Sequence, residues 1–411
     1  MVGVNSSNPR SQRFGWSIVA FCFMGLAFTF TSRTTLGVMM PVWMAEFGWS
    51  KSFLAGAGSV ALLAMAVAAP VSGNLIDRFG PKLVFTAGLI AIATAMLLIP
   101  VVQEPWQFVV VYSLIGGLGF GILGLPQAAA TVSRYFTEKR GLAIGVAQSG
   151  GNGGQLALIP LFAILIGVIG WRTSYVILGL AALAFVPLAL TLLRGTVAPA
   201  SLGVTDSLRS RLRLLAHNRT FWLMFAGFVI CGFTTAGVIE VHLLPYAALC
   251  GFDPVGSATA YGVLCAFNIV GTIGAGFLAD KLHRPTLLAA CYLLRAATFV
   301  LLMYVGSDLS LLFVFAVLFG LTNYATMPLI ASITATHIGV RVIGLTLGLM
   351  LGGHWIGAAI GSFVGGALFD LTARYQELWL VAIAAALVAT ALSLCVREHP
   401  PTPAAAAAAP A

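Results

Sequence analysis

Twelve apolar runs, each about 20 residues long or longer, are the feature that most limits how this chain can fold. They cover residues 15–41, 53–75, 83–102, 107–132, 142–168, 173–194, 220–246, 257–279, 286–305, 309–335, 343–368 and 377–396. Polar and apolar residues do not alternate within the runs, which excludes a β-barrel and predicts helices that cross a bilayer. Such helices satisfy every backbone polar group in lipid. We therefore expect an all-α membrane protein with twelve transmembrane helices.

The composition agrees with a lipid environment and excludes several classes of function. Of the 411 residues, 60% are hydrophobic and 8% are charged, whereas a soluble domain is about 25% charged. The formal net charge of +9 does not indicate nucleic-acid binding, because the basic residues form short clusters between the apolar runs. The six cysteines lie in apolar segments without metal or disulfide spacing. Since no H-E-x-x-H motif or phosphate-binding loop occurs, we expect neither an enzyme nor a cofactor or metal site.

The distribution of Lys and Arg predicts how the spans are oriented. With the N-terminus in the cytoplasm, only Lys51, Arg172 and Arg374 of the 21 basic residues fall in outer loops, and Arg33 and Arg295 fall within spans. The other basic residues then lie on the cytoplasmic side, as the positive-inside rule requires. We therefore expect both termini in the cytoplasm, and the first run to be a retained span and not a signal peptide.

A polar and partly basic segment divides the chain near its middle. This division predicts a six-helix bundle over residues 1–194, a cytoplasmic linker over 195–218 and a second six-helix bundle over 219–397. Residues 398–411 are rich in Ala and Pro and are predicted to be disordered.

The two halves contain similar sequences at a constant spacing of 203 residues, where GNLIDRFGPK and GFLADKLHRP correspond. The corresponding residues are Gly73 and Gly276, Asp77 and Asp280, Arg78 and Lys281, Gly141 and Gly344, and Gly145 and Gly348. Six helices repeated in parallel orientation is the plan of a two-bundle secondary transporter. In such a protein the site lies between the bundles near the membrane midplane.

GNLIDRFGPK resembles the loop between spans 2 and 3 of the major facilitator superfamily, whose pattern is G-x-x-x-D-R-x-G-x-[KR]. The weaker copy lies where that family has its second copy, and the resemblance covers essentially the whole chain. It implies two pseudo-symmetric six-helix bundles. It also implies that Asp77, Arg78 and Asp280 are gating and structural residues at the cytoplasmic helix ends.

A narrower resemblance is to the monocarboxylate and oxalate/formate carrier branch of that superfamily. FGWSIVAF is similar to the opening of its first span, and Arg33 lies where the branch carries an embedded lysine. SRYFTEKRGLAIGVAQSGGNGG also resembles its loop and fifth span. In span 8, however, Asn268 and Thr272 stand where the monocarboxylate carriers have Asp and Arg. The resemblance alone therefore does not imply proton–monocarboxylate symport.

Three charged residues lie inside spans: Arg33, Glu240 and Arg295. Embedded ionisable residues are candidates for function. Measured from Pro41 and Pro245 of the equivalent spans 1 and 7, Arg33 and Glu240 differ by three residues, or about 4.5 Å of helix rise. We therefore predict that these two residues pair across the bundles. The pair would act as a switch, because an anionic substrate or a proton could replace one partner.

Each embedded residue also has a second interpretation. If span 1 ended early, the Arg33 side chain would extend to the outer lipid headgroups. If span 7 ended early, Glu240 would be a carboxylate at the outer edge of the membrane without a role in transport. His242 is a weaker candidate for proton relay. Arg295 lies in the middle of span 9, where we expect a structural role.

Uncharged polar residues at mid-depth complete the candidate site. Spans 1, 4, 7 and 10 line the central cavity in the superfamily that the chain resembles, so Gln127, Asn323 and Tyr324 rank first as substrate ligands. Asn268 and His354 are further candidates. Each such residue also commonly joins helices by hydrogen bonds.

These features favour a secondary active transporter that moves a small organic anion, a carboxylate, across the cytoplasmic membrane of a bacterium. The embedded arginine suits this substrate because a planar guanidinium binds a carboxylate through two parallel hydrogen bonds. We expect a monomer that works by alternating access, with proton symport or exchange of a counter-anion.

The alternative is a proton-coupled drug or metabolite exporter of the same superfamily. Exporters of this type carry the motif G-x8-G-x3-G-P in span 5. Gly141, Gly150 and Gly154 fit the spacing, but Gln155 follows them in place of proline. A transporter-derived sensor without net flux also stays open.

Overall fold

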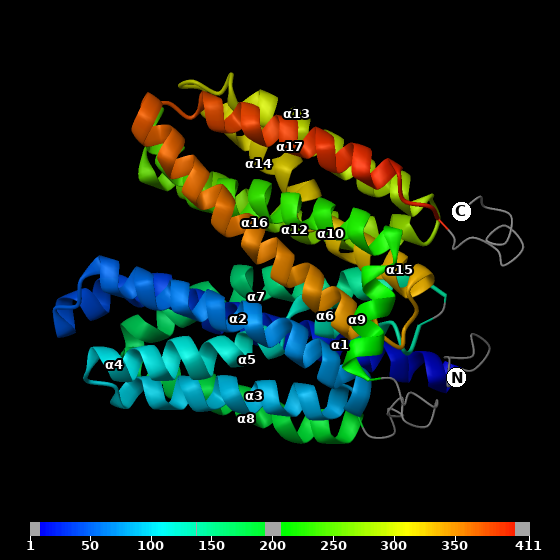
Figure 1. Ribbon diagram of the computed structural model, residues 1–411. Coiled ribbons are helices and arrows are strands. Elements are labelled where there is room, and N and C mark those ends of the chain that lie inside the picture. Colours follow the sequence, from blue (N-terminus) through cyan, green and yellow to red (C-terminus); the bar gives the residue numbers. More distant parts are fainter. Residues whose placement is uncertain (1–8, 137, 194–206, 399–411) are drawn as a thin grey trace, which may run out of the picture.

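The computed structural model describes residues 9–136, 138–193 and 207–398, and the regular elements within these residues are all helical. Twelve helical segments of the described chain are long and apolar enough to cross a membrane, and they coincide with the twelve predicted spans. The predicted all-α membrane fold is confirmed. The spans form two bundles, one from each half of the chain (Figure 1). Except for Glu398, the tail that was predicted to be disordered lies outside the described residues.

The N-terminal bundle contains spans 1 to 6. Five of these spans are α1 (Pro9–Phe47), α2 (Lys51–Phe79), α3 (Pro81–Leu98) with the 3-10 turn η1 (Ile99–Val101), α7 (Arg140–Ile169) and α8 (Trp171–Leu192). Span 4 consists of α4 (Pro105–Phe108), the π-helix η2 (Val109–Gly116), α5 (Gly117–Ile122) and α6 (Leu125–Val132). Gly80 ends α2 with φ +83°, a conformation that favours glycine, and Pro81 then begins α3.

The C-terminal bundle contains spans 7 to 12. Span 7 consists of α10 (Arg219–Gly232), the π-helix η4 (Phe233–Ile239) and α11 (Glu240–Leu249), and span 10 consists of α14 (Leu309–Asn323) and α15 (Thr326–His337). The other spans are α12 (Pro254–Ala279), α13 (Arg284–Leu302), α16 (Ile343–Thr372) and α17 (Gln376–Leu394). Side chains of Asn218, Asp253 and Asp308 accept backbone hydrogen bonds at the starts of α10, α12 and α14. A short helix, α9 (Leu208–Ala216), precedes this bundle.

Spans 4, 7 and 10 are interrupted near their middles. Span 4 breaks between α5 and α6, span 10 breaks between α14 and α15, and spans 4 and 7 contain the two π-helices. Breaks and π-helical turns leave backbone groups without their usual helical partners and are frequent at functional sites.

Arg295 on α13 supports the break in span 10. Its side chain is fully buried, and its Nη2 donates hydrogen bonds to the carbonyl oxygens of Thr322 (2.7 Å) and Asn323 (3.0 Å), at the end of α14. Its Nη1 lies 3.1 Å from the Sγ of Cys231 on α10. Arg295 therefore joins spans 7, 9 and 10, which is a structural role of the kind that the sequence predicted.

The two bundles converge at one end, which we call the terminus side because α1 begins and α17 ends there (Figure 1). Toward the opposite end, the far side, the bundles diverge. Glycines allow the close approach on the terminus side. A Cβ on Gly73 of α2 would lie 2.1 Å from the carbonyl oxygen of Gly344 on α16, and a Cβ on Gly276 of α12 would lie 2.3 Å from that of Gly141 on α7.

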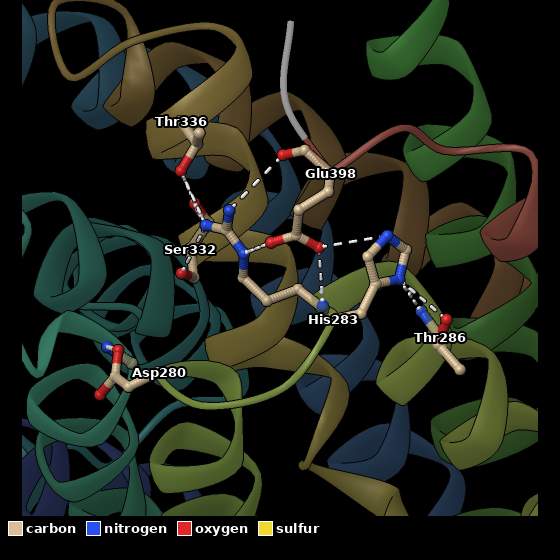
Figure 2. A network of polar contacts seen from close by, with 8 residues as sticks. Asp280, His283, Thr286, Ser332, Thr336 and Glu398 are labelled. Atoms are coloured by element: carbon tan, nitrogen blue, oxygen red, sulfur yellow. Dashed lines mark hydrogen bonds and ion pairs between the residues drawn. The ribbon is translucent and has the colours of Figure 1, made fainter.

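Helix ends within the C-terminal bundle are also held together on the terminus side. The guanidinium of Arg284, at the start of α13, donates hydrogen bonds to the Ser332 carbonyl oxygen (3.2 Å) and to Thr336 Oγ1 (2.7 Å) on α15. Glu398 forms an ion pair with the same guanidinium and accepts a hydrogen bond from the Arg284 N–H at 2.8 Å. Figure 2 shows Glu398, Ser332 and Thr336 gathered around this cation. The end of the described chain is thereby fixed to spans 9 and 10.

Candidate functional site

A central cavity lies between the two bundles. It is lined by α1, α2, span 4 and, from the other bundle, span 7, span 10 and α16. Its polar and charged lining residues are Thr29, Arg33, Cys231, Thr235, Glu240, Asn323, Tyr324, Thr326, His354 and Trp355. The breaks of spans 4 and 10 and the π-helix of span 7 lie beside this cavity, so this irregular backbone borders a space between the bundles.

Arg33 faces the central cavity and does not extend toward lipid headgroups. Its guanidinium carbon lies 5.0 Å from the ring centroid of Phe30 and 5.9 Å from that of Trp355, which belongs to α16 of the other bundle. Aromatic faces attract a cation at such distances. Within the described chain, the guanidinium makes no hydrogen bond or ion pair. Its donors are therefore open to a ligand in the cavity.

The main chain at Arg33 is held in place from span 4. The hydroxyl of Tyr112, a buried residue of η2, donates a hydrogen bond to the Arg33 carbonyl oxygen at 2.8 Å. The neighbouring Thr34 Oγ1 accepts a hydrogen bond from Gln155 Nε2 on α7 at 2.9 Å. Gln155 stands at the position where exporters carry proline. Its side chain thus joins α7 to α1 beside Arg33.

Glu240 lies on the opposite wall of the same cavity, at the start of α11. Its Oε1 is 3.5 Å from the hydroxyl of Tyr324. The predicted ion pair with Arg33 is not formed in this structure, since none of the ion pairs among the described residues joins these two side chains. The bundles diverge on the far side, where spans 1 and 7 would have to approach each other for the pair to form.

One stripe of α1 continues from Arg33 toward the far side. Gly37, Met40, Pro41 and Met44 follow Arg33 at helical spacing and border an open space. Gly37, Pro41 and Met44 are exposed. The stripe therefore extends the side of α1 that bears Arg33 toward the far side.

Three further predicted ligands also line the cavity: Asn323, Tyr324 and His354. Asn323 and Tyr324 lie at the break in span 10, where α14 ends. His354 on α16 packs its ring 4.7 Å from that of Phe228. Spans 1, 7, 10 and 11 contain six charged or polar candidates. Five of them line the central cavity: Arg33, Glu240, Asn323, Tyr324 and His354.

Gln127 and Asn268 do not line the cavity, so we revise their prediction as substrate ligands. Gln127 is fully buried, and its Nε2 donates to the Ala69 carbonyl oxygen (3.2 Å) and to Ser72 Oγ (2.7 Å) within the N-terminal bundle. Asn268 Nδ2 on α12 donates to Asn152 Oδ1 on α7 at 3.4 Å. Both residues join helices, and Asn268 does so between the bundles.

His242, the predicted proton-relay residue, also faces away from the cavity. Its Nε2 lies 3.2 Å from the carbonyl oxygen of Ser362 on α16, and its ring packs 5.7 Å from that of Tyr375. It is two residues from Glu240, so the two side chains project from different faces of the helix. The geometry assigns His242 to packing between α11 and α16.

Asp77 joins the two bundles on the terminus side. Its carboxylate is 1% exposed and accepts hydrogen bonds from the N–H groups of Gly344 (3.0 Å) and Leu345 (2.8 Å), in the first turn of α16. A carboxylate at this place also interacts favourably with the positive end of the helix dipole. This geometry supports the gating and structural role that the family resemblance implied for Asp77.

Arg78, by contrast, does not take part in this contact. It is exposed, and its guanidinium lies 5.7 Å from the ring of Phe79. The partners of Asp77 are instead Arg134 (Nη2–Oδ1 3.5 Å) and Arg211 (Nη1–Oδ2 4.0 Å). Burial lowers the pKa of Arg134 from its ordinary value, and the Asp77 carboxylate partly opposes this shift.

Arg211 is a functional candidate that the sequence analysis missed. It belongs to α9, in the linker between the bundles, and its side chain is 2% exposed. Besides its contact with Asp77, it donates a hydrogen bond to Asn74 Oδ1. The hydrophobic periodicity of α9 was the available signal, because Arg211 falls on the same face as the buried Leu215.

Asp280 repeats the bonds of Asp77 in the other half. Its Oδ1 accepts from the Gly141 N–H (2.7 Å) and its Oδ2 from the Leu142 N–H (2.9 Å), at the start of α7. Unlike Asp77, it is exposed. The acceptor of each half therefore binds the first turn of a helix in the opposite half.

Comparison with known proteins identifies the group to which this architecture belongs. A sequence model of the Major Facilitator Superfamily matches residues 22–305 and 273–411. The chain belongs to the major facilitator superfamily.

Relatives within this superfamily extend along almost the whole chain. An uncharacterized MFS-type transporter, YcxA of Bacillus subtilis (strain 168), is 26% identical over 400 residues, which are 95% of this chain and 96% of YcxA. Monocarboxylate transporter 13 of Rattus norvegicus is 26% identical over 387 residues, 92% of this chain and 88% of the relative. Monocarboxylate transporter 11 of Homo sapiens is 26% identical over 384 residues, 90% of this chain and 81% of the relative.

Solved structures share the fold. The E. coli fucose:proton symporter FucP superposes with a TM-score of 0.72 over 91% of this chain and 97% of FucP, at 18% identity. The proton:xylose symporter XylE gives a TM-score of 0.67 over 94% of this chain and 95% of XylE, at 16% identity. The chain is therefore a multi-pass membrane transporter with the fold of this superfamily.

Proposed function

We propose that this major facilitator superfamily chain is a secondary active transporter that carries a small organic anion, a carboxylate, by alternating access. The observation that carries the proposal is the Arg33 guanidinium, which faces the central cavity without a hydrogen bond or ion pair in the described chain. A desolvated guanidinium binds a carboxylate strongly and with defined orientation. The monocarboxylate transporters among the relatives support the same substrate class.

The positive-inside distribution of Lys and Arg supports a cytoplasmic location for the terminus side, in the cytoplasmic membrane of a bacterium. With that orientation, we assign the structure to an outward-facing state, because the bundles converge on the terminus side and diverge on the far side. Closure of spans 1 and 7 on the far side would produce the inward-facing state. In that state Arg33 and Glu240 are expected to form the predicted pair.

Uptake into liposomes tests this proposal. The purified chain is reconstituted and exposed to a panel of labelled small carboxylates, with and without an imposed pH gradient or an internal counter-anion. We expect saturable uptake of at least one carboxylate, accelerated by the pH gradient if transport is symport and by the counter-anion if it is exchange. Arg33→Gln abolishes uptake, whereas Arg374→Gln, which removes an exposed arginine outside the cavity, does not. Absence of saturable anion flux rejects the proposal and favours the drug or metabolite exporter.

A further inference from the structure

The central cavity carries one formal charge from each bundle. Arg33 of α1 supplies the positive charge and Glu240 of α11 supplies the negative charge, and the other described residues of its lining are uncharged or histidine. The two charges come from different bundles, so the cavity contains a positive and a negative group but no formal net charge from these two residues.

Neither charge is neutralised by another side chain in the described chain. Arg33 is in contact with the rings of Phe30 and Trp355, and Glu240 has the Tyr324 hydroxyl at 3.5 Å as its recorded polar contact. No ion pair of the described residues includes either one. Arg33 is partly buried and Glu240 is exposed, so an oppositely charged group of a ligand in the cavity can reach each of them. A ligand that pairs with both would therefore gain from both.

A plain monocarboxylate satisfies only one side of this cavity. Its carboxylate pairs with Arg33, but it also brings a second negative charge toward Glu240, and like charges repel. A ligand with a carboxylate and a protonated amine pairs with both walls and leaves the net charge of the cavity unchanged. The aromatic rings of Phe30 and Trp355 then contact the apolar part of such a ligand.

We propose that the substrate is a small zwitterion, an amino acid whose carboxylate binds Arg33 and whose ammonium group binds Glu240. This inference rests on the proposed function, because it needs Arg33 to bind a carboxylate. The cavity limits the size of the ligand. The space open to the centre of a water-sized sphere is about 50 Å³, and one water needs roughly 10–15 Å³ in that measure. A ligand of a few heavy atoms therefore fits the cavity as it stands.

Binding of matched pairs of ligands tests this inference. The purified full chain in detergent is titrated with propionate and alanine, and with butyrate and 4-aminobutyrate, by calorimetry. Within a pair, the two compounds share the carboxylate and the carbon chain and differ by the amine, which is adjacent to the carboxylate in alanine and distant in 4-aminobutyrate. We expect at least one amine-bearing compound to bind about tenfold or more tightly than its partner, the contribution of one charge-assisted hydrogen bond.

Variants assign that preference to Glu240. Glu240→Gln is expected to reduce the ratio of the two affinities to about one while binding of the amine-free carboxylate is kept or strengthened, because a like charge has been removed. Glu240→Asp keeps the charge and is expected to retain a preference for the amine, which separates recognition from loss of folding. Arg33→Gln weakens both members of a pair. Thermal unfolding of each variant verifies that it is folded.

Four results would overturn the inference. Equal or tighter binding of the amine-free compounds to the native chain rejects the zwitterion and leaves the proposed function intact. A ratio that Glu240→Gln does not change shows that Glu240 does not bind the amine. If amine-free carboxylates bind more tightly at lower pH and Glu240→Gln removes that dependence, Glu240 takes a proton and not an ammonium group. Absence of binding by all four compounds, unaffected by Arg33→Gln, rejects the proposed function as well.

Discussion

Asp77 and Asp280 make the same pair of backbone hydrogen bonds in opposite directions between the two bundles. Asp77 of α2 accepts from the N–H groups of Gly344 and Leu345, and Asp280, just after α12, accepts from those of Gly141 and Leu142. The two carboxylates are 203 residues apart in the sequence, and so are the corresponding N–H groups that they bind. The internal repeat therefore produces a two-fold symmetric closure of the terminus side.

Asp77→Asn is expected to weaken this closure more than Asp280→Asn. Asp77 is buried against Arg134 and Arg211, so its loss leaves buried cations unpaired, at about 3–5 kcal/mol. Asp280 is exposed, and its loss resembles that of an N-cap, about 1 kcal/mol. Distances between spin labels on non-natural amino acids at Met44 and Leu249, on the far side, report the conformation. They should shorten more in Asp77→Asn, and equal shortening would contradict the asymmetry.

Gly73→Ala is expected to open the terminus side. The added methyl group would lie 2.1 Å from the Gly344 carbonyl oxygen, and backbone on both sides leaves it no space. Gly274→Ala is the matched control, because a Cβ at Gly274 meets no atom within 4 Å. The same spin-label distances measure the outcome. Unchanged distances in Gly73→Ala would mean that the close contact of α2 with α16 is not needed for this conformation.

Arg211→Ala is expected to loosen the terminus side although the residue lies in the linker. Its loss removes a hydrogen bond to Asn74 and a cation beside Asp77, together about 1–3 kcal/mol. Arg209→Ala is the control, since Arg209 belongs to the same helix and is exposed. Protection of the N–H groups of Gly344 and Leu345 from hydrogen exchange should fall in Arg211→Ala alone. Equal protection in both variants would remove Arg211 from the closure.

Arg295→Lys is expected to destabilise the C-terminal bundle by about 1–3 kcal/mol, because a single ammonium group cannot bond the Thr322 and Asn323 carbonyl oxygens and Cys231 on α10 at the same time, as Nη2 and Nη1 of the planar guanidinium do. Thermal unfolding in detergent measures the effect. Lys281→Arg, at a position outside the spans, is the control for replacing one basic residue type by the other. Native stability in Arg295→Lys would show that the break in span 10 does not depend on this guanidinium.

The sequence predicted the elements well, because long apolar runs and a repeat of constant spacing determine them. It predicted less well the direction in which individual side chains project from their helices. Asp77 and Arg78 are adjacent and therefore point about 100° apart on a helix, so both could not join the same contact. Gln127 lies in span 4, where a π-helix and a break change the helical phase. The predicted pair of Arg33 and Glu240 is not formed in this structure, and no residue pattern encodes which conformational state a transporter adopts.

Arg33 is proposed to bind the carboxylate of the substrate, and equilibrium binding to the purified chain measures this contact. The ligand is the carboxylate that the native chain takes up in liposomes. The affinities of Arg33→Gln, Arg33→Lys and Arg374→Gln are compared with that of the native chain, after thermal unfolding confirms that each variant is folded. We predict a loss of about tenfold or more for Arg33→Gln, a smaller loss for Arg33→Lys and native affinity for Arg374→Gln. Native affinity in Arg33→Gln would contradict the account.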